Sequence, residues 1–465
     1  MYVLLKGIGK GSMLNFEKQD TKGRAEMLAL FDAGTFVETG AFVRRKGDDQ
    51  PYDAVLTGYG SVNGKLAFAF VQDSDRKAGA LDEVGADKIE KLYEQALRVG
   101  APVIGVFDSA GAVVYDGAPA LSAYGRVMKC VSAASGVIPQ IALIQGICTG
   151  MAAVIATMMD VTVTIKSLSE MAFHSRSLKG DDKTPYAENC GLTTINADDE
   201  ASAVASVRDL ITLLPRNNRD VADVEPTDDP ARLVPADELT GLALVKALAD
   251  NGKIIDLYEA FAPEMTTALC AIGGRTCGVI ATDASIEDGK LTPKAARKAA
   301  RMVSFCDAFS IPVVTLVDSI GVDTTAPREP SPVFGKLAKA YATATTAKIS
   351  VVVGNAYGAA FTLLGSRALG ADLALALPET VISVLPPEVA VAFLMNDQIT
   401  ADKPREAVEA EWMMTVASPV AAAESGDIDD IIPAAELRAR LSSALYMLAE
   451  KADTTPDRKH GVPTL

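Results

Sequence analysis

The sequence has few of the side chains from which metal centres and histidine-based catalytic sites are built. Two histidines occur in 465 residues, His174 and His460, and the six cysteines include no C-x-x-C pair. A metal site is therefore not expected, and neither a G-x-S-x-G elbow nor a G-x-x-x-x-G-K-[ST] phosphate loop is present. We interpret the cysteines as buried, reduced thiols. Two alternatives stay open for His174, a pocket residue or a surface-loop residue, whereas His460 belongs to the C-terminal tail.

Positive charge and long hydrophobic runs are also scarce. The formal net charge of −16 at pH 7 argues against sequence-independent binding to nucleic acid or anionic membrane, because both depend on clustered Lys and Arg. The apolar run from Gly150 to Ile165 is broken by Asp160, well before the ~20 residues that a membrane span requires, and no signal peptide is apparent. We therefore expect a soluble, cytoplasmic protein.

Aromatic residues are few as well, at 6% of the chain, although 49% of the residues are hydrophobic. This composition, rich in Ala, Val, Gly and Ile, favours close packing of helices on a sheet and hence the α/β class. The length predicts two domains of about 200 to 230 residues each. Because residues 214–235 combine four prolines with a cluster of acids, they are typical of a linker. We predict an N-terminal domain at 1–225 and a C-terminal domain at 226–465.

One strand-to-turn pattern occurs twice, about two hundred residues apart. Residues 101–111 read APVIGVFDSAG, and residues 311–321 read IPVVTLVDSIG. Upstream of each copy, GKLAFAFVQD (64–73) and GRTCGVIATD (274–283) also predict strands. Downstream, IPQIALIQGICTG (138–150) and AKISVVVGNAYG (347–358) predict strands that end in G-x-x-x-G turns.

Helices are expected between these strands. In the first half, the expected helix has an apolar face formed by Ile89, Leu92, Ala96 and Val99. The corresponding helix of the second half begins with Thr292 as its cap and a proline in the next position. The shared order is strand, helix, strand, helix, strand, glycine turn, helix. It predicts a duplicated βαβ layout with a mostly parallel sheet in each half.

Each glycine turn is a candidate oxyanion site. A strand that ends in glycine and leads into a helix leaves backbone N–H groups unpaired at the positive end of the helix dipole. Glycine also lets a reacting carbonyl approach those donors closely. The candidate donors are Gly150 with Met151 and Gly358 with Ala359, and two such sites indicate a reaction with two carbonyl-like oxygens. The alternative is that the turns are tight structural connections preserved by duplication.

A row of four basic residues is the remaining candidate binding feature. The spacing i, i+3, i+4, i+7 places on one helical face Lys294, Arg297, Lys298 and Arg301. Two alternatives stay open for this row, a solvated face or a basic strip for ligand phosphates or an acidic partner.

The sequence resembles the carboxyltransferase subunits of biotin-dependent acyl-CoA carboxylases and decarboxylases, such as propionyl-CoA carboxylase beta and methylmalonyl-CoA decarboxylase alpha. The resemblance spans roughly residues 20 to 450 in the family's order and includes YDAVLTGYGSVNGKLAFAFVQD, ASGVIPQIALIQGICTG, SFCDAFSIPVVTLVDSIG and GNAYGAAFTLLGSRALGADLALALP. It implies two crotonase-like (ClpP/crotonase) ββα-superhelix domains related by internal duplication. It also implies an acyl-CoA site in the N-terminal domain, a biotin site in the C-terminal domain, and a homo-hexamer built as a trimer of dimers.

Carried over residue by residue, the resemblance assigns roles to the two turns. The N–H groups of Gly150 and Met151 are expected to hold the thioester oxygen, and those of Gly358 and Ala359 the ureido oxygen of biotin. Further substrate contacts are expected from Gly111, Ala112, Gly321, Tyr357 and Ala360. This chain departs from the family where Met151 replaces a second glycine and where Ala110, Gly111, Ala112 and Val113 replace two adjacent glycines and an arginine.

The resulting hypothesis is a carboxyltransferase that moves a carboxyl group between carboxybiotin and a short-chain acyl-CoA through an enolate stabilised by two backbone oxyanion holes. Biotin is expected on a separate carrier protein, because no lysine here has an M-K-M setting. Expected partners are that carrier and either a biotin carboxylase or membrane decarboxylase subunits. Two alternatives remain, a crotonase-type acyl-CoA hydratase or thioesterase and a non-catalytic scaffold subunit.

Overall fold

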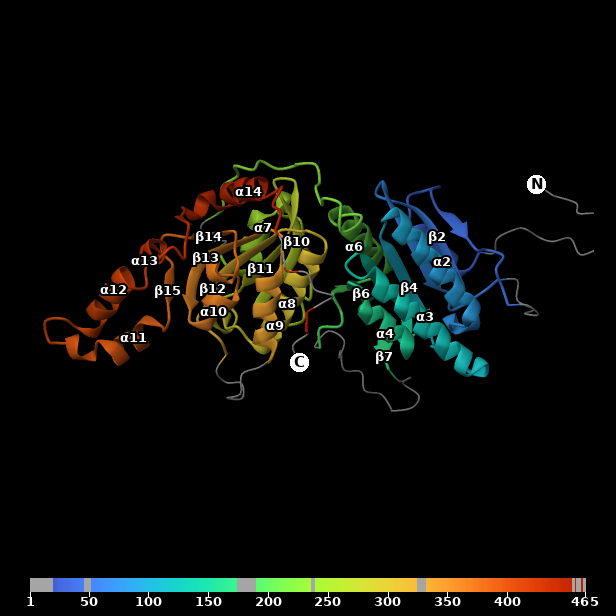
Figure 1. Ribbon diagram of the computed structural model, residues 1–465, viewed down its shortest axis with the longest axis horizontal. Helices are drawn as coiled ribbons and strands as arrows, with labels where there is room; N and C mark the ends of the chain where they lie inside the picture. The colour runs from blue at the N-terminus through green and yellow to red at the C-terminus, as the bar shows by residue number, and fades with distance from the viewer. Residues whose placement is uncertain are drawn as a thin grey trace, which may run out of the picture.

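The computed structural model describes residues 20–45, 52–173, 190–235, 239–323, 332–453, 456 and 461–462. Two sheets lie side by side, one in each half of the chain, with helices packed around each of them (Figure 1). His174 and His460 lie outside the described residues. No helix in the described ranges is long and apolar enough to cross a membrane.

The first sheet has eight described strands in the order β1-β2-β3-β4-β5-β6-β8, with β7 paired to the far end of β5. Its antiparallel part joins β1 to β2 and β2 to β3, and the remaining pairs are parallel. The strands are β1 (Val37–Thr39), β2 (Val55–Val62), β3 (Lys65–Gln72), β4 (Val103–Ser109), β5 (Gln140–Thr149), β6 (Val161–Ile165), β7 (Glu170–Ala172) and β8 (Ile195–Ala197).

The second sheet repeats this plan in the order β9-β10-β11-β12-β13-β14-β16, with β15 paired to the far end of β13. The predicted duplication and the mostly parallel sheets are therefore confirmed. The strands are β9 (Ile254–Asp256), β10 (Met265–Ile272), β11 (Arg275–Thr282), β12 (Val313–Ser319), β13 (Lys348–Tyr357), β14 (Leu373–Ala376), β15 (Val381–Ser383) and β16 (Asp430–Ile431).

Helices cover both faces of each sheet. On the first sheet, α2, α3 and α4 cover one face and α1 and α6 the other; on the second sheet, α7 and α14 cover one face and α8 and α9 the other. Their bounds are α1 (Lys22–Leu30), α2 (Glu83–Val99), α3 (Ala118–Ala134), α4 (Met151–Met158), α6 (Glu200–Leu213), α7 (Gly241–Leu248), α8 (Pro293–Ala308), α9 (Pro332–Thr343) and α14 (Leu437–Met447). The remaining described helices are α10 (Ala359–Leu363), α11 (Pro387–Leu394), α12 (Arg405–Thr415) and α13 (Pro419–Glu424).

Local sequence signals explain where the crossover helices begin and which side they bury. As expected, α8 starts after Thr292, whose Oγ1 accepts a hydrogen bond from the N–H of Ala295 at 3.0 Å, and Pro293 occupies the first helical position. In α2, three residues of the predicted apolar face are buried. The fourth, Val99, is 56% exposed, because it is the last residue of the helix and the chain turns away at Gly100.

The two halves of the chain meet along a continuous apolar junction. The hydrophobic cluster beneath α6 extends through Leu257 and Phe261 into the cluster beneath α8, and the N–H of Tyr258 donates to the carbonyl of Thr194 at 2.7 Å. The predicted domain boundary at residue 225 stays a prediction. Just before it, Val224 donates to the carbonyl of Gly274 at 2.9 Å, so this part of the chain pairs with the second sheet.

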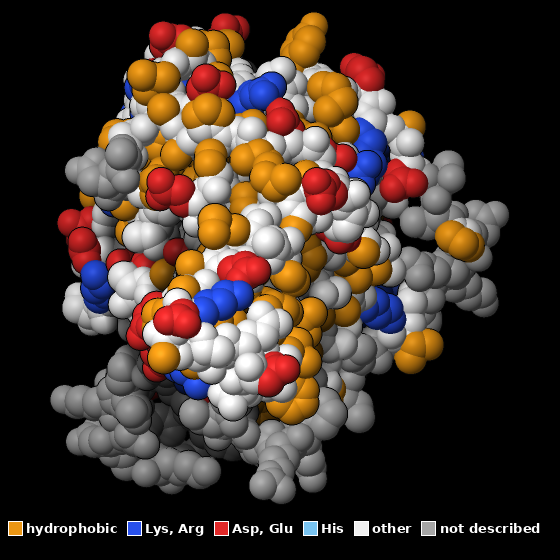
Figure 2. Space-filling model, turned by 90° about the vertical axis from the view of Figure 1, so that its left-hand side faces the viewer, with side chains coloured by type: hydrophobic (Ala, Val, Ile, Leu, Met, Phe, Trp, Pro, Cys, Tyr) orange, Lys and Arg blue, Asp and Glu red, His pale blue; other side chains and the backbone are white. Residues whose placement is uncertain are grey.

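Beyond the second sheet, α11, α12 and α13 extend away from the body of the molecule, at the left of Figure 1. Figure 2 faces this end and shows hydrophobic side chains exposed among the charged ones. Large apolar side chains exposed on this segment are Val384, Val389, Phe393, Leu394, Met414, Val416 and Val420.

Candidate active site

Both glycine turns have a backbone conformation that requires glycine. Gly150, between β5 and α4, has φ 63° and ψ −130°, and Gly358, between β13 and α10, has φ 55° and ψ −132°. Residues with a Cβ rarely adopt these angles. The two halves of the chain therefore contain the same turn, which leads from the end of a parallel strand into a helix.

The hydrogen bonds at these turns differ from the predicted donor roles. The N–H of Gly150 donates to the carbonyl of Ala172 at 3.0 Å, and the N–H of Gly358 donates to the carbonyl of Ser383 at 2.9 Å. Neither glycine N–H is therefore available to a substrate in this structure. Met151 and Ala359 begin their helices, so their N–H groups have no partner within the helix, and the described residues supply none.

A second loop approaches each turn from the preceding strand. A Cβ built on Gly111 would lie 3.8 Å from the carbonyl oxygen of Thr149, and a Cβ built on Gly321 would lie 3.8 Å from that of Tyr357. Past each glycine, Ala112 forms a parallel bridge with Leu81, and Val322 forms one with Leu291.

The bridges leave one main-chain donor free in each loop. The flanking Val113 donates to Leu81 at 3.2 Å, and Asp323 donates to Leu291 at 3.1 Å. The N–H groups of Ala112 and Val322 make no hydrogen bond within the described part of the chain. Each turn is thus accompanied by a second free N–H, and Val322 is a residue that the sequence analysis did not identify. The signal was present, because Val322 follows DSIG in the register in which Ala112 follows DSAG.

An aspartate clamps the strand before each glycine turn. Asp108 Oδ1 accepts from the N–H of Ile147 at 3.1 Å, and Asp318 Oδ1 accepts from the N–H of Asn355 at 2.8 Å. The carboxylate occupies the place of a side chain on the first glycine of G-x-x-x-G. A Cβ on Gly146 would lie 2.3 Å from Asp108 Oδ1, and a Cβ on Gly354 would lie 2.2 Å from Asp318 Cγ. The motif therefore needs its first glycine for the clamp and its second for the turn.

The electrostatic environments of the two clamps differ. Lys22 Nζ lies 2.5 Å from Asp108 Oδ2. Burial raises the pKa of Asp108, but the hydrogen bond and charge of Lys22, together with hydrogen bonds from Ser74 and the N–H of Ile147, outweigh it, so the pKa lies below its usual value. Burial raises the pKa of Asp318 above its usual value, and no cation within ion-pair distance is found among the described residues.

The difference in charge around the two clamps arises at one position. Gly23 packs against Asp73 as Gly241 packs against Asp283, so the two glycines are equivalent positions of the repeat. The residue before each glycine is Lys22 in the first copy and Thr240 in the second, and threonine carries no charge.

The other expected substrate contacts are partly accessible. Tyr357 is 8% exposed, and its hydroxyl donates to Asn355 Oδ1 at 2.7 Å. Ala360, the second residue of α10, is fully buried, and its role as a substrate contact stays a prediction. Of the two residues that carry the free N–H groups, Ala359 is exposed and Met151 half-buried.

The profile of the carboxyl transferase domain matches residues 21–463. The chain belongs to the carboxyl transferase family. As a member it is a carboxyltransferase enzyme, and its two sheets are the duplicated crotonase-like domains that the sequence predicted.

Relatives in the carboxyl transferase family match nearly the whole chain. The carboxyltransferase subunit of propionyl-CoA carboxylase from Haloferax mediterranei is 32% identical over 98% of this chain and 96% of its own. The methylmalonyl-CoA decarboxylase subunit alpha from Veillonella parvula is 32% identical over 97% of this chain and 95% of its own. The solved structure of transcarboxylase 12S, a hexamer with hydrolysed methylmalonyl-coenzyme A bound, has a TM-score of 0.87 at 30% identity, covering 95% of this chain and 92% of that chain.

Proposed function

We propose that this carboxyltransferase moves a carboxyl group between carboxybiotin, held on a separate carrier protein, and a short-chain acyl-CoA. The observation that carries the proposal is the presence of the same two-donor turn in both halves of the chain. A single substrate carbonyl needs one such turn, whereas carboxyl transfer between a thioester and a cyclic urea involves two carbonyl oxygens. The relatives named for propionyl-CoA and methylmalonyl-CoA support a short acyl chain.

In the first turn, the N–H groups of Ala112 and Met151 are the proposed donors to the thioester oxygen. Negative charge develops on this oxygen when the α-proton leaves and the enolate forms. Donors already aligned on that oxygen stabilise the enolate more than the neutral thioester. Removal of one such donor typically costs about 3 kcal/mol of activation free energy. Met151 supplies its N–H as a glycine would, because the main chain and not the side chain acts.

In the second turn, the N–H groups of Val322 and Ala359 are the proposed donors to the ureido oxygen of biotin. These neutral main-chain donors fit a urea carbonyl, whose oxygen gains negative charge when its nitrogen loses the carboxyl group. Carboxybiotin, when bound, supplies the carboxyl group and the nitrogen that takes up the α-proton. The chain itself then needs no catalytic acid or base, which agrees with its scarcity of histidine.

The activity test uses purified protein, free biotin and, separately, malonyl-, methylmalonyl- and glutaconyl-CoA. Loss of each ester is followed by mass spectrometry with and without biotin. Biotin-dependent loss of one ester would establish the reaction and identify the substrate. Loss without any effect of biotin would favour the acyl-CoA hydratase or thioesterase alternative. No loss of any ester by folded, oligomeric protein would favour the scaffold alternative.

Gly358→Val tests the assignment of the second turn to biotin. A Cβ at Gly358 would lie 3.2 Å from the carbonyl oxygen of Val384, in a conformation that valine does not tolerate. We expect transfer to be abolished while acyl-CoA still binds. Gly150→Val is the matched substitution in the first turn, and it should weaken acyl-CoA binding. The opposite pair of results would exchange the two assignments.

We also propose that the chain assembles as a homo-hexamer, as transcarboxylase 12S does. The exposed apolar side chains of α11–α13 support this, because an apolar surface of this kind is usually covered by another protein surface. Phe393, which is 80% exposed, is the natural residue to change. Phe393→Asp should lower the mass measured by light scattering, and an unchanged mass would remove α11 from the interface. A biotin carrier and carboxylase or membrane decarboxylase subunits are the further proposed partners.

A further inference from the structure

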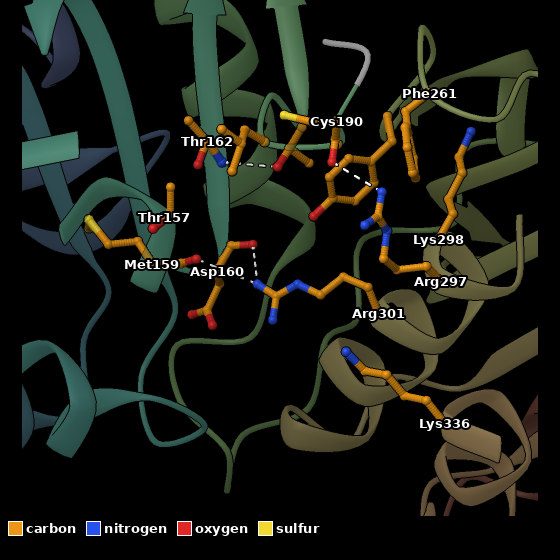
Figure 3. Close-up of a pocket in the computed structure, with 14 residues that line it drawn as sticks. Thr157, Met159, Asp160, Thr162, Cys190, Phe261, Arg297, Lys298, Arg301 and Lys336 are labelled. Atoms are coloured by element: carbon orange, nitrogen blue, oxygen red, sulfur yellow. Dashed lines mark hydrogen bonds between the residues drawn. The ribbon is translucent and has the colours of Figure 1, made fainter. Parts of the chain in front are cut away.

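A cavity of about 230 Å³ lies between the two halves of the chain. Its wall on the first domain comes from the end of α4 and the start of β6, including Thr157, Asp160 and Thr162. Its wall on the second domain comes from α8 and α9, including Arg297, Arg301 and Lys336 (Figure 3). The cavity therefore exists only because the two halves of the chain meet there, since each half supplies part of its wall.

Three cationic side chains converge on this cavity (Figure 3). Arg297 donates to the main-chain carbonyl of Cys190 at 3.3 Å and lies over the ring of Phe261, with its Cζ 4.8 Å from the ring centroid. Arg301 donates to the main-chain carbonyl of Asp160 at 2.8 Å. These contacts orient both guanidinium groups without neutralising them.

No carboxylate of the described residues lies within ion-pair distance of the three cations. Elsewhere in the chain, Arg208 pairs with Asp32 at 2.6 Å and Arg438 pairs with Asp250 at 2.7 Å. Among the described residues, the three cations thus form no ion pair, in a chain whose formal net charge is −16, and the carboxylate that acts on them electrostatically is that of Asp160 on Arg301.

Lys298, another member of the predicted row, also lines the cavity, but its ammonium group is engaged by main-chain carbonyls. Lys298 is 3% exposed, and its ammonium group donates to the main-chain carbonyl of Met265 at 2.6 Å. Lys294 is exposed outside the cavity lining. Three members of the row, Arg297, Lys298 and Arg301, therefore line the cavity, and of these Lys298 has its ammonium group bonded to main-chain carbonyls.

Among the described residues, Asp160 is the carboxylate that lines the cavity. Its Oδ2 accepts from the N–H of Gln140 at 2.9 Å. Figure 3 shows this carboxylate directed away from the guanidinium of Arg301. Burial raises its pKa to about 6. The carboxylate is therefore held by the N–H of Gln140 and by the charge of Arg301, and its negative charge is lost only below about pH 6.

We propose that this interdomain cavity binds a small phosphate-type dianion, either free phosphate or the phosphate of a small ester, between Arg297, Arg301 and Lys336. Guanidinium and ammonium groups together with the hydroxyls of nearby threonines are the donors that a tetrahedral oxyanion requires. The cavity is displaced along α4 from the proposed acyl-CoA turn. Thr157 lies six residues along α4 from Met151, which is about 9 Å at 1.5 Å per residue.

The test is a calorimetric titration of the assembled protein with inorganic phosphate, with sodium chloride used to hold the ionic strength constant. Wild type should give a saturable isotherm with one site per chain. The double variant Arg297→Gln/Lys336→Gln should bind on the order of tenfold more weakly or worse, because each charged donor contributes substantially to anion binding. Lys336→Gln alone, an exposed change on α9, gives the same readout if the double variant does not fold.

The matched control is Arg98→Gln/Lys253→Gln, which removes the same two charges from exposed positions outside the cavity. It should bind phosphate as wild type does. Unsaturable heats, or equal weakening in both double variants, would overturn the proposal. A second titration uses coenzyme A. If the cavity variant loses coenzyme A binding, the cavity belongs to the acyl-CoA substrate and the proposal of a separate site is wrong; unchanged coenzyme A binding supports it.

Discussion

The first glycine of each G-x-x-x-G motif offers the sharpest test of the two-turn arrangement. Gly146→Ala would place a Cβ 2.3 Å from Asp108 Oδ1, and Gly354→Ala would place one 2.2 Å from Asp318 Cγ. Ordinary carbon contacts are about 3.5 Å or longer, so each carboxylate must retreat by roughly 1 Å. Its hydrogen bond to the following strand, at Ile147 or Asn355, then weakens or breaks.

We expect a small loss of stability and a large loss of rate. Inserting a methyl group into a filled site typically costs about 1–3 kcal/mol. Displacing an aligned group by about 1 Å can cost on the order of a hundredfold in rate, and losing an oxyanion donor costs about 10²–10³ in kcat. Gly146→Ala should lose more stability than Gly354→Ala, because Asp108 is also held by Lys22, whereas Asp318 has no such partner among the described residues.

The assay measures kcat for biotin-dependent loss of the carboxylated ester, together with thermal unfolding followed by circular dichroism. Gly125→Ala is the matched control, because a Cβ there meets no atom within 4 Å and the residue lies within α3. It should keep the wild-type kcat and gain up to about 1 kcal/mol of stability from helix propensity. If Gly146→Ala behaves like Gly125→Ala, the clamp has no role in catalysis.

Three further outcomes are expected. Lys22→Met removes the cation that lowers the pKa of Asp108, so the acid limb of the pH–rate profile should move to higher pH; an unmoved limb would exclude this coupling. Asp160→Asn removes a buried acid whose pKa is raised to about 6. A raised acid pKa penalises folding above the unfolded pKa, so the variant should gain little stability near pH 4 and up to about 3 kcal/mol above pH 6, at about 1.4 kcal/mol per pKa unit. Arg438→Met should lower the free energy of unfolding by about 3–5 kcal/mol in urea titration, because this fully buried guanidinium pairs with a buried carboxylate. Arg440 lies on the same helix and forms an exposed ion pair with Asp430, so Arg440→Met should cost less than about 1 kcal/mol.

Local patterns explain why so much of the fold could be predicted. The strands that end at Asp108 and Asp318 are short apolar runs followed by glycine, and the structure places both as parallel strands at the same point of each sheet. Thr292 and the proline after it form a local start signal for a helix, with threonine as the cap and proline in the first helical position. The antiparallel strands β2 and β10 were not predicted, although each forms a hairpin with the strand that follows it.

The assignment of individual donors could not be made from local patterns. The N–H of Gly150 is taken by Ala172, more than twenty residues further along the chain, and that of Gly358 by Ser383. Both acceptors belong to short strands that pair with the far ends of β5 and β13. From the sequence alone, which does not show those strand pairings, the N–H groups of the two glycines and of the residues after them are equally good candidate donors.

The sequence by itself determined the duplicated order of strands and helices and the position of both glycine turns. These follow from the spacing of apolar residues and from backbone angles open to glycine, which are properties of neighbouring residues. Only the tertiary structure decided which N–H groups remain free and that, among the described residues, Asp108 has a lysine partner whereas Asp318 has none. It also decided that Arg297 and Arg301 line a cavity between the two halves of the chain. Those outcomes depend on contacts between residues that are far apart along the chain, and the folded chain alone brings such residues together.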